Sequence, residues 1–124
     1  MKTITLSLIT ALTLAGCAST QTYKAPTQNY RLKGQDNAIT INGAIFSQKK
    51  HELDTPKLTA GIYINGSLYI EVPLDRQGNG QATGGTFEDK STEASCHSKP
   101  VAKGIANIDC MVFIDNEKTV TLTF

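Results

Sequence analysis

Cysteine and histidine are the side chains in this sequence best suited to chemistry, and three of them lie in its C-terminal third. Cys96 and His97 are adjacent, and Cys110 follows shortly after them. Thiolate and imidazole groups bind metals, and a thiolate is also a nucleophile. No CxxC or HxxxH-type spacing accompanies these residues, however. The simpler interpretation is therefore a disulfide between Cys96 and Cys110, and a metal or reactive-thiol site is the alternative.

The remaining candidate catalytic groups lack the partners that catalysis requires. His51 lies in the polar run 48–52, where we expect a solvated loop, and His97 is expected to face solvent. Carboxylates are close together at 88–89 and 115–117, where they most simply make turns soluble. Nucleophilic catalysis needs a base held beside an activated serine or cysteine, and the sequence does not indicate one. We expect no enzyme, no catalytic residues, no metal and no cofactor.

Four glycines between residues 78 and 85 have a superficial likeness to a phosphate-binding loop. Their spacing differs from that of such loops, and no strand–loop–helix pattern surrounds them. We interpret them as turn residues, with Gly84-Gly85 marking a bulge or a sharp bend.

The first seventeen residues have the features of an export signal. Lys2 is followed by a mostly apolar run over residues 4–14, and small residues precede Cys17. As a helix this run would be about 16 Å long, roughly half the thickness of a bilayer core. It is therefore too short for a transmembrane span.

The string Leu14-Ala15-Gly16-Cys17 resembles the lipobox of bacterial lipoproteins. The resemblance implies that residues 1–16 are cleaved and that Cys17 becomes the lipid-modified N-terminus; the alternative is an ordinary signal with a chance cysteine. Ala18 and Ser19, rather than Asp, follow the cysteine, which implies the outer membrane, facing the periplasm, in a Gram-negative host. Each buried methylene contributes about 0.8 kcal/mol, so two or three acyl chains hold a protein firmly on a membrane.

Export places the two remaining cysteines, Cys96 and Cys110, in an oxidising compartment, where a disulfide is the default. The bond would close a loop of about 15 residues, to which the chain-entropy model assigns about 3 kcal/mol.

The composition after cleavage indicates one small, electrically balanced domain. The remaining 108 residues carry 11 Lys and Arg against 11 Asp and Glu. Nothing in this balance would attract nucleic acid, and no basic run is interleaved with aromatic residues. We therefore expect no nucleic-acid binding.

The mature chain divides into two parts. Residues 17–36 are polar with little apolar periodicity, so we expect a flexible lipidated tether with a reach on the order of 25 Å. Residues 37–124 show apolar alternation broken by frequent turn signals. This pattern predicts an all-β domain: a small antiparallel β-sandwich or barrel of about seven or eight short strands.

Two Asn-Gly pairs, Asn42-Gly43 and Asn65-Gly66, lie between apolar alternations, so both predict hairpin turns. In the second hairpin, Tyr63 would lie opposite Leu68. One face would then carry Tyr63, Leu68, Ile70 and Val72, and the other Ile62, Ile64, Tyr69 and Glu71. Because both faces are largely apolar, the hairpin is expected either to be central in the sheet or to present a surface to a partner. The candidate partner surface is Ile62, Tyr63, Ile64 and Tyr69.

The last hairpin lets the apolar pattern choose between two registers. A two-residue turn at Asn116-Glu117 would bring Asp109 onto the apolar face. A three-residue loop over 115–117 instead pairs Val112 with Val120 and Cys110 with Leu122, which makes one face wholly apolar. We therefore expect the three-residue loop, with Cys110 pointing inward towards the strand of Cys96.

These observations favour a lipid-anchored envelope lipoprotein that acts as a non-catalytic binding or accessory module, with an envelope protein as partner. One alternative is an inhibitor of a lysozyme-like enzyme, because small periplasmic and lipid-anchored lysozyme inhibitors are similar in size, β content and disulfide use. Another is a small-ligand or metal carrier that uses a barrel interior or the Cys96-His97 region.

Overall fold

The strands follow one another as two consecutive antiparallel meanders. The computed structural model of the chain describes residues 19–124 apart from 52, 54 and 103–104, and this part forms eight strands in two four-stranded sheets. The first sheet contains β1 (Ser19–Tyr30), β2 (Ile39–Lys49), β3 (Lys57–Ile64) and β4 (Ser67–Leu74). The second contains β5 (Gly80–Thr83), β6 (Thr92–Ala102), β7 (Ile105–Ile114) and β8 (Glu117–Thr123). The predicted all-β class is confirmed.

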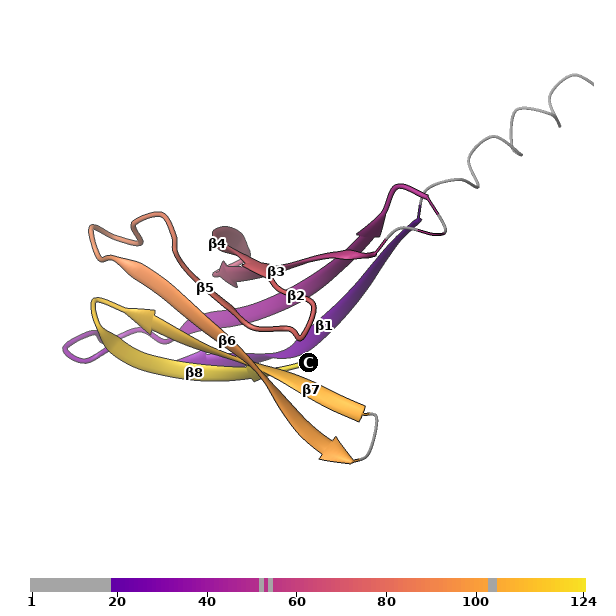
Figure 1. The fold of residues 1–124 in the computed structure, drawn as a ribbon. Helices are drawn as coiled ribbons and strands as arrows, with labels where there is room; N and C mark the ends of the chain where they lie inside the picture. The colour runs from indigo at the N-terminus through magenta and orange to yellow at the C-terminus, as the bar shows by residue number, and fades with distance from the viewer. Residues whose placement is uncertain (1–18, 52, 54, 103–104) are drawn as a thin grey trace, which may run out of the picture.

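The two sheets pack face to face and share one apolar interior (Figure 1). The large side chains with almost no exposed surface come from both sheets: Ile41, Ile62, Ile64, Ile70, Val72, Val112, Ile114 and Leu122. Within most strands, buried and exposed residues alternate, as expected for a sheet with one face in water.

The sheets also approach each other along their edges, where β4 lies beside β5 and β1 beside β8. At the first edge, the Gly85 N–H donates to the Tyr69 carbonyl at 2.9 Å. At the second, Gln28 Nε2 donates to the Thr121 carbonyl at 2.7 Å. Covered edges of this kind protect a β protein from edge-to-edge pairing with other chains.

Strand β1 corrects the expectation of a flexible tether over residues 17–36. Residues 19–30 pair with β2 from Ser19↔Lys49 to Tyr30↔Ile39, with an irregularity between Ala25 and Gln28. The sequence pattern missed this strand because Ala25 is its only fully buried apolar residue. The sequence therefore leaves a single residue between Cys17 and the start of the sheet.

The first predicted hairpin is also wrong, because Asn42-Gly43 lies inside β2. This strand runs unbroken and pairs with β1 on one side and β3 on the other. Gly43 faces the interior, where a Cβ atom would lie 2.9 Å from Leu122 Cδ1 and 3.0 Å from Phe124 Cζ. The glycine makes room for these two side chains of the opposite sheet rather than for a turn.

The second predicted hairpin, β3–β4, forms with the expected turn. Asn65 and Gly66 have φ values of 51° and 86°, as a type I′ turn requires, and Tyr63 pairs with Leu68. A β-bulge at Tyr69 then shifts the pairing by one residue.

This bulge decides which side chains of the hairpin are buried. Beyond it, Ile70 and Val72 turn to the same face as Ile62 and Ile64, and all four have no exposed surface. The predicted grouping of Ile70 and Val72 with Tyr63 is therefore wrong, and the hairpin has one interior face instead of two apolar ones.

The β7–β8 hairpin reaches the predicted register by a different route. Its turn has two residues, Asp115-Asn116, with φ values of 53° and 62°, rather than a loop of three. A bulge at Thr119, whose hydroxyl donates to the Val112 carbonyl at 2.8 Å, compensates for the missing loop residue. Cys110 consequently lies opposite Leu122, and the predicted apolar face is confirmed.

A tyrosine–carboxylate contact joins β1 to β8 at the end of the sandwich where β1 finishes. The Tyr30 hydroxyl donates to Glu117 Oε2, and the Lys33 N–H donates to Glu117 Oε1 at 3.4 Å. The hydrogen bond to the carboxylate raises the pKa of Tyr30 above its usual 10.0, and desolvation and the negative charge of Glu117 add to this shift.

We expect this contact to make stability sensitive to alkaline pH. Because the pKa of Tyr30 is higher in the folded protein than in the unfolded chain, the contact stabilises fully below about pH 10, the unfolded value, and fades as the pH rises through the folded pKa. Urea unfolding at increasing pH should show a steeper loss of stability for wild type than for Tyr30→Phe. Tyr23→Phe, which removes an exposed hydroxyl bonded to Gln21, is the control and should keep the wild-type slope. A wild-type slope in Tyr30→Phe would contradict the assignment.

Glycines let β5 and the segment after it approach β4 closely. A Cβ atom at Gly80 would overlap the Pro73 carbonyl, and one at Gly84 would overlap the Tyr69 carbonyl. At Gly85, by contrast, the nearest atoms would lie 4.0 Å away. The Gly84-Gly85 pair, predicted to mark a bulge or bend, therefore contains one position that is sterically restricted and one that is open.

This difference predicts that alanine substitutions at the two adjacent positions change the stability by very different amounts. Gly84→Ala should lower the free energy of unfolding by about 1–3 kcal/mol, because the added methyl displaces β4. Gly85→Ala should change it by less than about 0.5 kcal/mol. Chemical denaturation of the two variants measures both values, and equal losses would show that the close approach is not what limits this position.

Candidate binding site

The structure separates the four residues predicted as a partner surface. Ile62 and Ile64 have no exposed surface and belong to the interior, so they are not part of any contact surface. Tyr69 is half-buried, and its ring packs edge-on against Phe87 with 5.5 Å between the ring centroids. Tyr63 is half-buried on the outer face of the first sheet.

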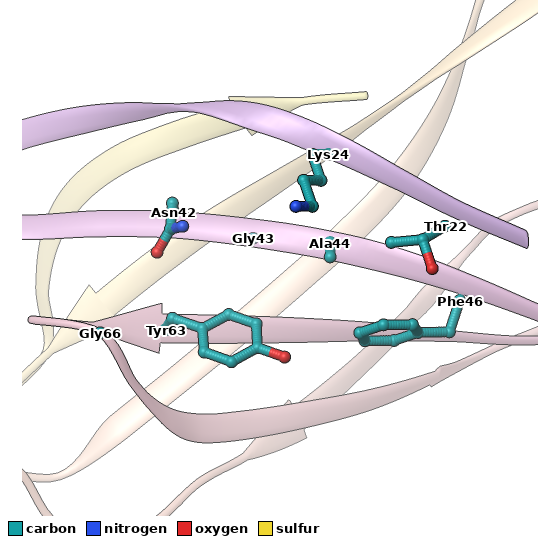
Figure 2. A pocket seen from close by; sticks show the side chains of 8 residues that line it. All are labelled: Thr22, Lys24, Asn42, Gly43, Ala44, Phe46, Tyr63 and Gly66. Atoms are coloured by element: carbon teal, nitrogen blue, oxygen red, sulfur yellow. The ribbon is translucent and has the colours of Figure 1, made fainter.

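Tyr63 lines a shallow hollow of about 300 Å³ on that outer face. Figure 2 shows the hollow and the three strands that form it. Its lining residues are Thr22 and Lys24 of β1, Asn42, Gly43, Ala44 and Phe46 of β2, Tyr63 of β3, and Gly66 of the following turn.

Three large side chains converge above Gly61 beside this hollow. A Cβ atom there would lie 3.2 Å from Leu68 Cδ1, 3.4 Å from Phe46 Cε2 and 3.5 Å from Tyr63 Cε1. In Figure 2 the two aromatic rings lie in line along β3, with the Tyr63 hydroxyl directed towards Phe46. Leu68 is 46% exposed, so the cluster of Phe46, Tyr63 and Leu68, which we call the outer cluster, is open to contact from outside.

The side of the hollow nearest β1 is polar. Thr22 and Lys24 project from β1, and Asn42 lies on β2, on the other side of Lys24 from Thr22 (Figure 2). Lys24 is the one charged side chain among the lining residues. The hollow thus combines an apolar, aromatic side with a small number of hydrogen-bonding groups, which is the usual composition of binding sites.

The register of three strands assembles this site, and sequence reasoning found only Tyr63. Lys24 pairs with Ala44, whose small side chain lines the hollow, and Ala44 pairs with Gly61 on the next strand, which lies under the outer cluster. Lys24 was missed because its strand was interpreted as a tether. Phe46 was missed because Asn42-Gly43 was interpreted as a turn that would have redirected its strand. The short side chains at the floor positions were the available signal.

The outer face of the second sheet brings together side chains that sequence reasoning did not connect. Ser95 Oγ lies 2.9 Å from His97 Nε2, and Asp109 is paired directly opposite His97. The hydroxyl of Thr123 donates to Asp109 Oδ1 at 2.9 Å. Among the described contacts no hydrogen bond joins His97 to Asp109, so the carboxylate does not orient the imidazole as a catalytic triad requires. His97 is exposed, and so is His51 in the β2–β3 connection.

The predicted disulfide is present. Cys96 on β6 and Cys110 on β7 are directly opposite each other, bonded, and without exposed surface. Their thiols are therefore committed to the bond. In the part of the chain that the structure describes, no group of three or more His, Cys, Asp or Glu is placed to hold a metal ion.

Cys17 and the predicted signal segment 1–16 lie outside the described residues. Among residues 19–124, with the gaps given above, no helix is long and apolar enough to cross a membrane. No protein-family model, curated protein or solved structure matches the chain. The geometry of the hollow and the outer cluster is therefore the basis for a functional proposal.

The disulfide should account for a large part of the stability of the domain. Replacing both Cys96 and Cys110 by Ala opens a loop of about 15 residues, and we expect the free energy of unfolding to fall by about 3 kcal/mol. Urea denaturation measures this change. Adding a thiol reductant should destabilise the wild type similarly and leave the double variant unaffected. A loss below about 1 kcal/mol would contradict this expectation. It would mean that residual structure already restricts the unfolded chain without the disulfide.

Proposed function

We propose that this chain is a lipid-anchored envelope lipoprotein that acts as a non-catalytic binding module, with an envelope protein as its partner. The observation that carries the proposal is the outer cluster of Phe46, Tyr63 and Leu68, which a rigid sheet presents beside the hollow. The lipobox-like string ending at Cys17 supports the anchor, and Ala18 and Ser19 after it support a position on the outer membrane, facing the periplasm.

The outer cluster has the properties of an interface anchor. Aromatic side chains are enriched among the residues that carry most of the binding energy at protein interfaces, and they bury large areas with few rotatable bonds. Phe46, Tyr63 and Leu68 come from three neighbouring strands, so the backbone beneath them is already ordered before a partner arrives. Binding then costs less conformational entropy than ordering a loop would.

The hollow beside the outer cluster adds selectivity to the contact that this cluster makes with a partner. The small residues Gly43 and Ala44 keep its floor low, which leaves a recess for an apolar side chain of the partner. Lys24 stands at the opposite side and can pair with a partner carboxylate. Lys24 and Tyr63 are the two titratable groups of the lining, and both can donate hydrogen bonds to a partner surface.

Site-specific crosslinking in intact cells tests this proposal. A photo-crosslinking amino acid in place of Tyr63 should give a discrete adduct, whereas the same residue in place of Met111, on the outer face of the second sheet, should not. Leu68→Asp, which adds a charge to the outer cluster, should abolish the adduct from position 63 and leave folding intact, because Leu68 is exposed.

Two results would count against the proposal. Equal adducts from positions 63 and 111, or none from either, would remove the outer cluster as the contact surface. Mass spectrometry of the mature protein tests the anchor separately, because an exported chain with an unmodified Cys17 sulfur would show that there is no lipid attachment.

A further inference from the structure

The two ends of the sandwich differ in shape. One end carries the start of β1, the β2–β3 and β4–β5 connections, and the passage from β6 to β7. We call this end the open end. Figure 1 shows that the arm of β1, β2 and β3 diverges there from the β6–β7 hairpin, with the C-terminal residue between them. The opposite end carries the β1–β2 and β5–β6 connections and the two tight turns.

The open end exposes apolar surface at the margin of the interior. Between the diverging strands is a hollow of about 310 Å³ with an almost wholly apolar lining from both sheets: Tyr23, Ile45, Leu58, Ile108 and Phe124. Tyr23 is 52% exposed, and Leu53, in the β2–β3 connection, is 99% exposed. Of the three large apolar side chains that are well exposed in the described part of the chain, these two lie at the open end, and the third is Leu68 of the outer cluster.

Charge is also distributed unequally between the ends. The described residues of the segments at the open end, 49–57, 74–80 and 99–105 without 52, 54, 103 and 104, include five Lys and Arg against one Asp. The segments at the opposite end, 31–38, 84–92 and 114–118, contain four against five. A protein of balanced total charge therefore has a positive end and a slightly negative one, and the positive end is complementary to an anionic lipid surface.

The position of Cys17 in the sequence also points to the open end as the part of the protein nearest the membrane. β1 starts at Ser19 beside Lys49, two residues after Cys17. Two residues span at most about 7 Å, so a lipid anchor on Cys17 would hold the open end against the membrane. This step rests on the lipidation of Cys17 in the proposed function.

We propose that the open end docks directly on a bilayer that contains anionic lipid. Leu53 enters the headgroup region, where apolar side chains are favoured, and the surrounding Lys and Arg side chains lie against lipid phosphates. The strands then run away from the membrane, and the outer cluster faces sideways, accessible to a partner in the same envelope layer.

The absence of tryptophan from the sequence makes a direct test possible. Leu53→Trp places a single fluorescent reporter at the open end, and Leu68→Trp places a matched one on an exposed leucine of the outer face. The mature proteins are reconstituted in vesicles of phosphatidylethanolamine and phosphatidylglycerol that include brominated phospholipid as a quencher. We expect the Leu53→Trp emission to shift to the blue and to be quenched several-fold more than that of Leu68→Trp.

The electrostatic part of the proposal has its own controls. Combining Leu53→Trp with Lys50→Glu and Lys57→Glu, replacing phosphatidylglycerol by phosphatidylcholine, or raising the salt concentration should each reduce the quenching, since ions screen charges near a surface. Quenching that none of these changes affects would overturn the role assigned to the basic residues.

Two further results would overturn the docking itself. One is equal quenching of the two reporters while the protein stays bound to vesicles. The other is a blue shift of Leu53→Trp that depends on protein concentration and not on lipid, which would assign the open end to a second copy of the chain. Intact mass of the same samples reports the acyl chains on Cys17. An acylated protein without docking refutes this inference alone, whereas an unmodified Cys17 refutes the proposed anchor and the docking with it.

Discussion

Burial of one face of each sheet against the other is the interaction on which the rest of this structure depends. A four-stranded meander has one apolar face, so neither half of the chain can remove its own apolar side chains from water. Ile41 and Ile62 from one sheet and Leu122 from the other lose all their exposed surface in the shared interior. The bulges at Tyr69 and Thr119 serve this interior, because each sets which face of the following strand points inward. The outer faces are consequently left for residues that packing does not require.

The sequence could predict those parts of the fold that follow from the alternation of apolar and polar residues along a strand. Alternation identified the all-β class, and the apolar face containing Val112 and Val120 led to the correct register of the last hairpin. The turn itself was not predictable, because a three-residue loop and a two-residue turn followed by a bulge place the same residues inward. Asn42-Gly43 has a strong local turn signal, yet Gly43 is needed for close packing against the other sheet, a long-range requirement that local spacing does not reveal. Strand β1 carries too few buried apolar residues to be distinguished from a polar linker.

The candidate site was less predictable than the fold, for a related reason. Its members come from neighbouring strands and meet only through the register of those strands, so a single strand indicates one member at a time. Tyr63 was identified from its own hairpin, whereas Lys24 and Phe46 depend on pairings across β1, β2 and β3. The same is true of the Ser95–His97 contact, where residues two apart share a face once β6 is known to be a strand.

The order of the strands has a consequence for how the protein reaches this structure. Within each sheet, every strand is hydrogen-bonded to the next one along the chain, so in the described part of the protein no ladder joins strands that are distant in sequence. Pairing between consecutive strands closes shorter loops than pairing between distant ones, which reduces the entropy lost before favourable pairing begins. A newly made chain is at first unfolded and exposed to proteases and to other chains. A meander that can assemble strand by strand shortens that vulnerable period compared with a Greek-key sandwich of the same length.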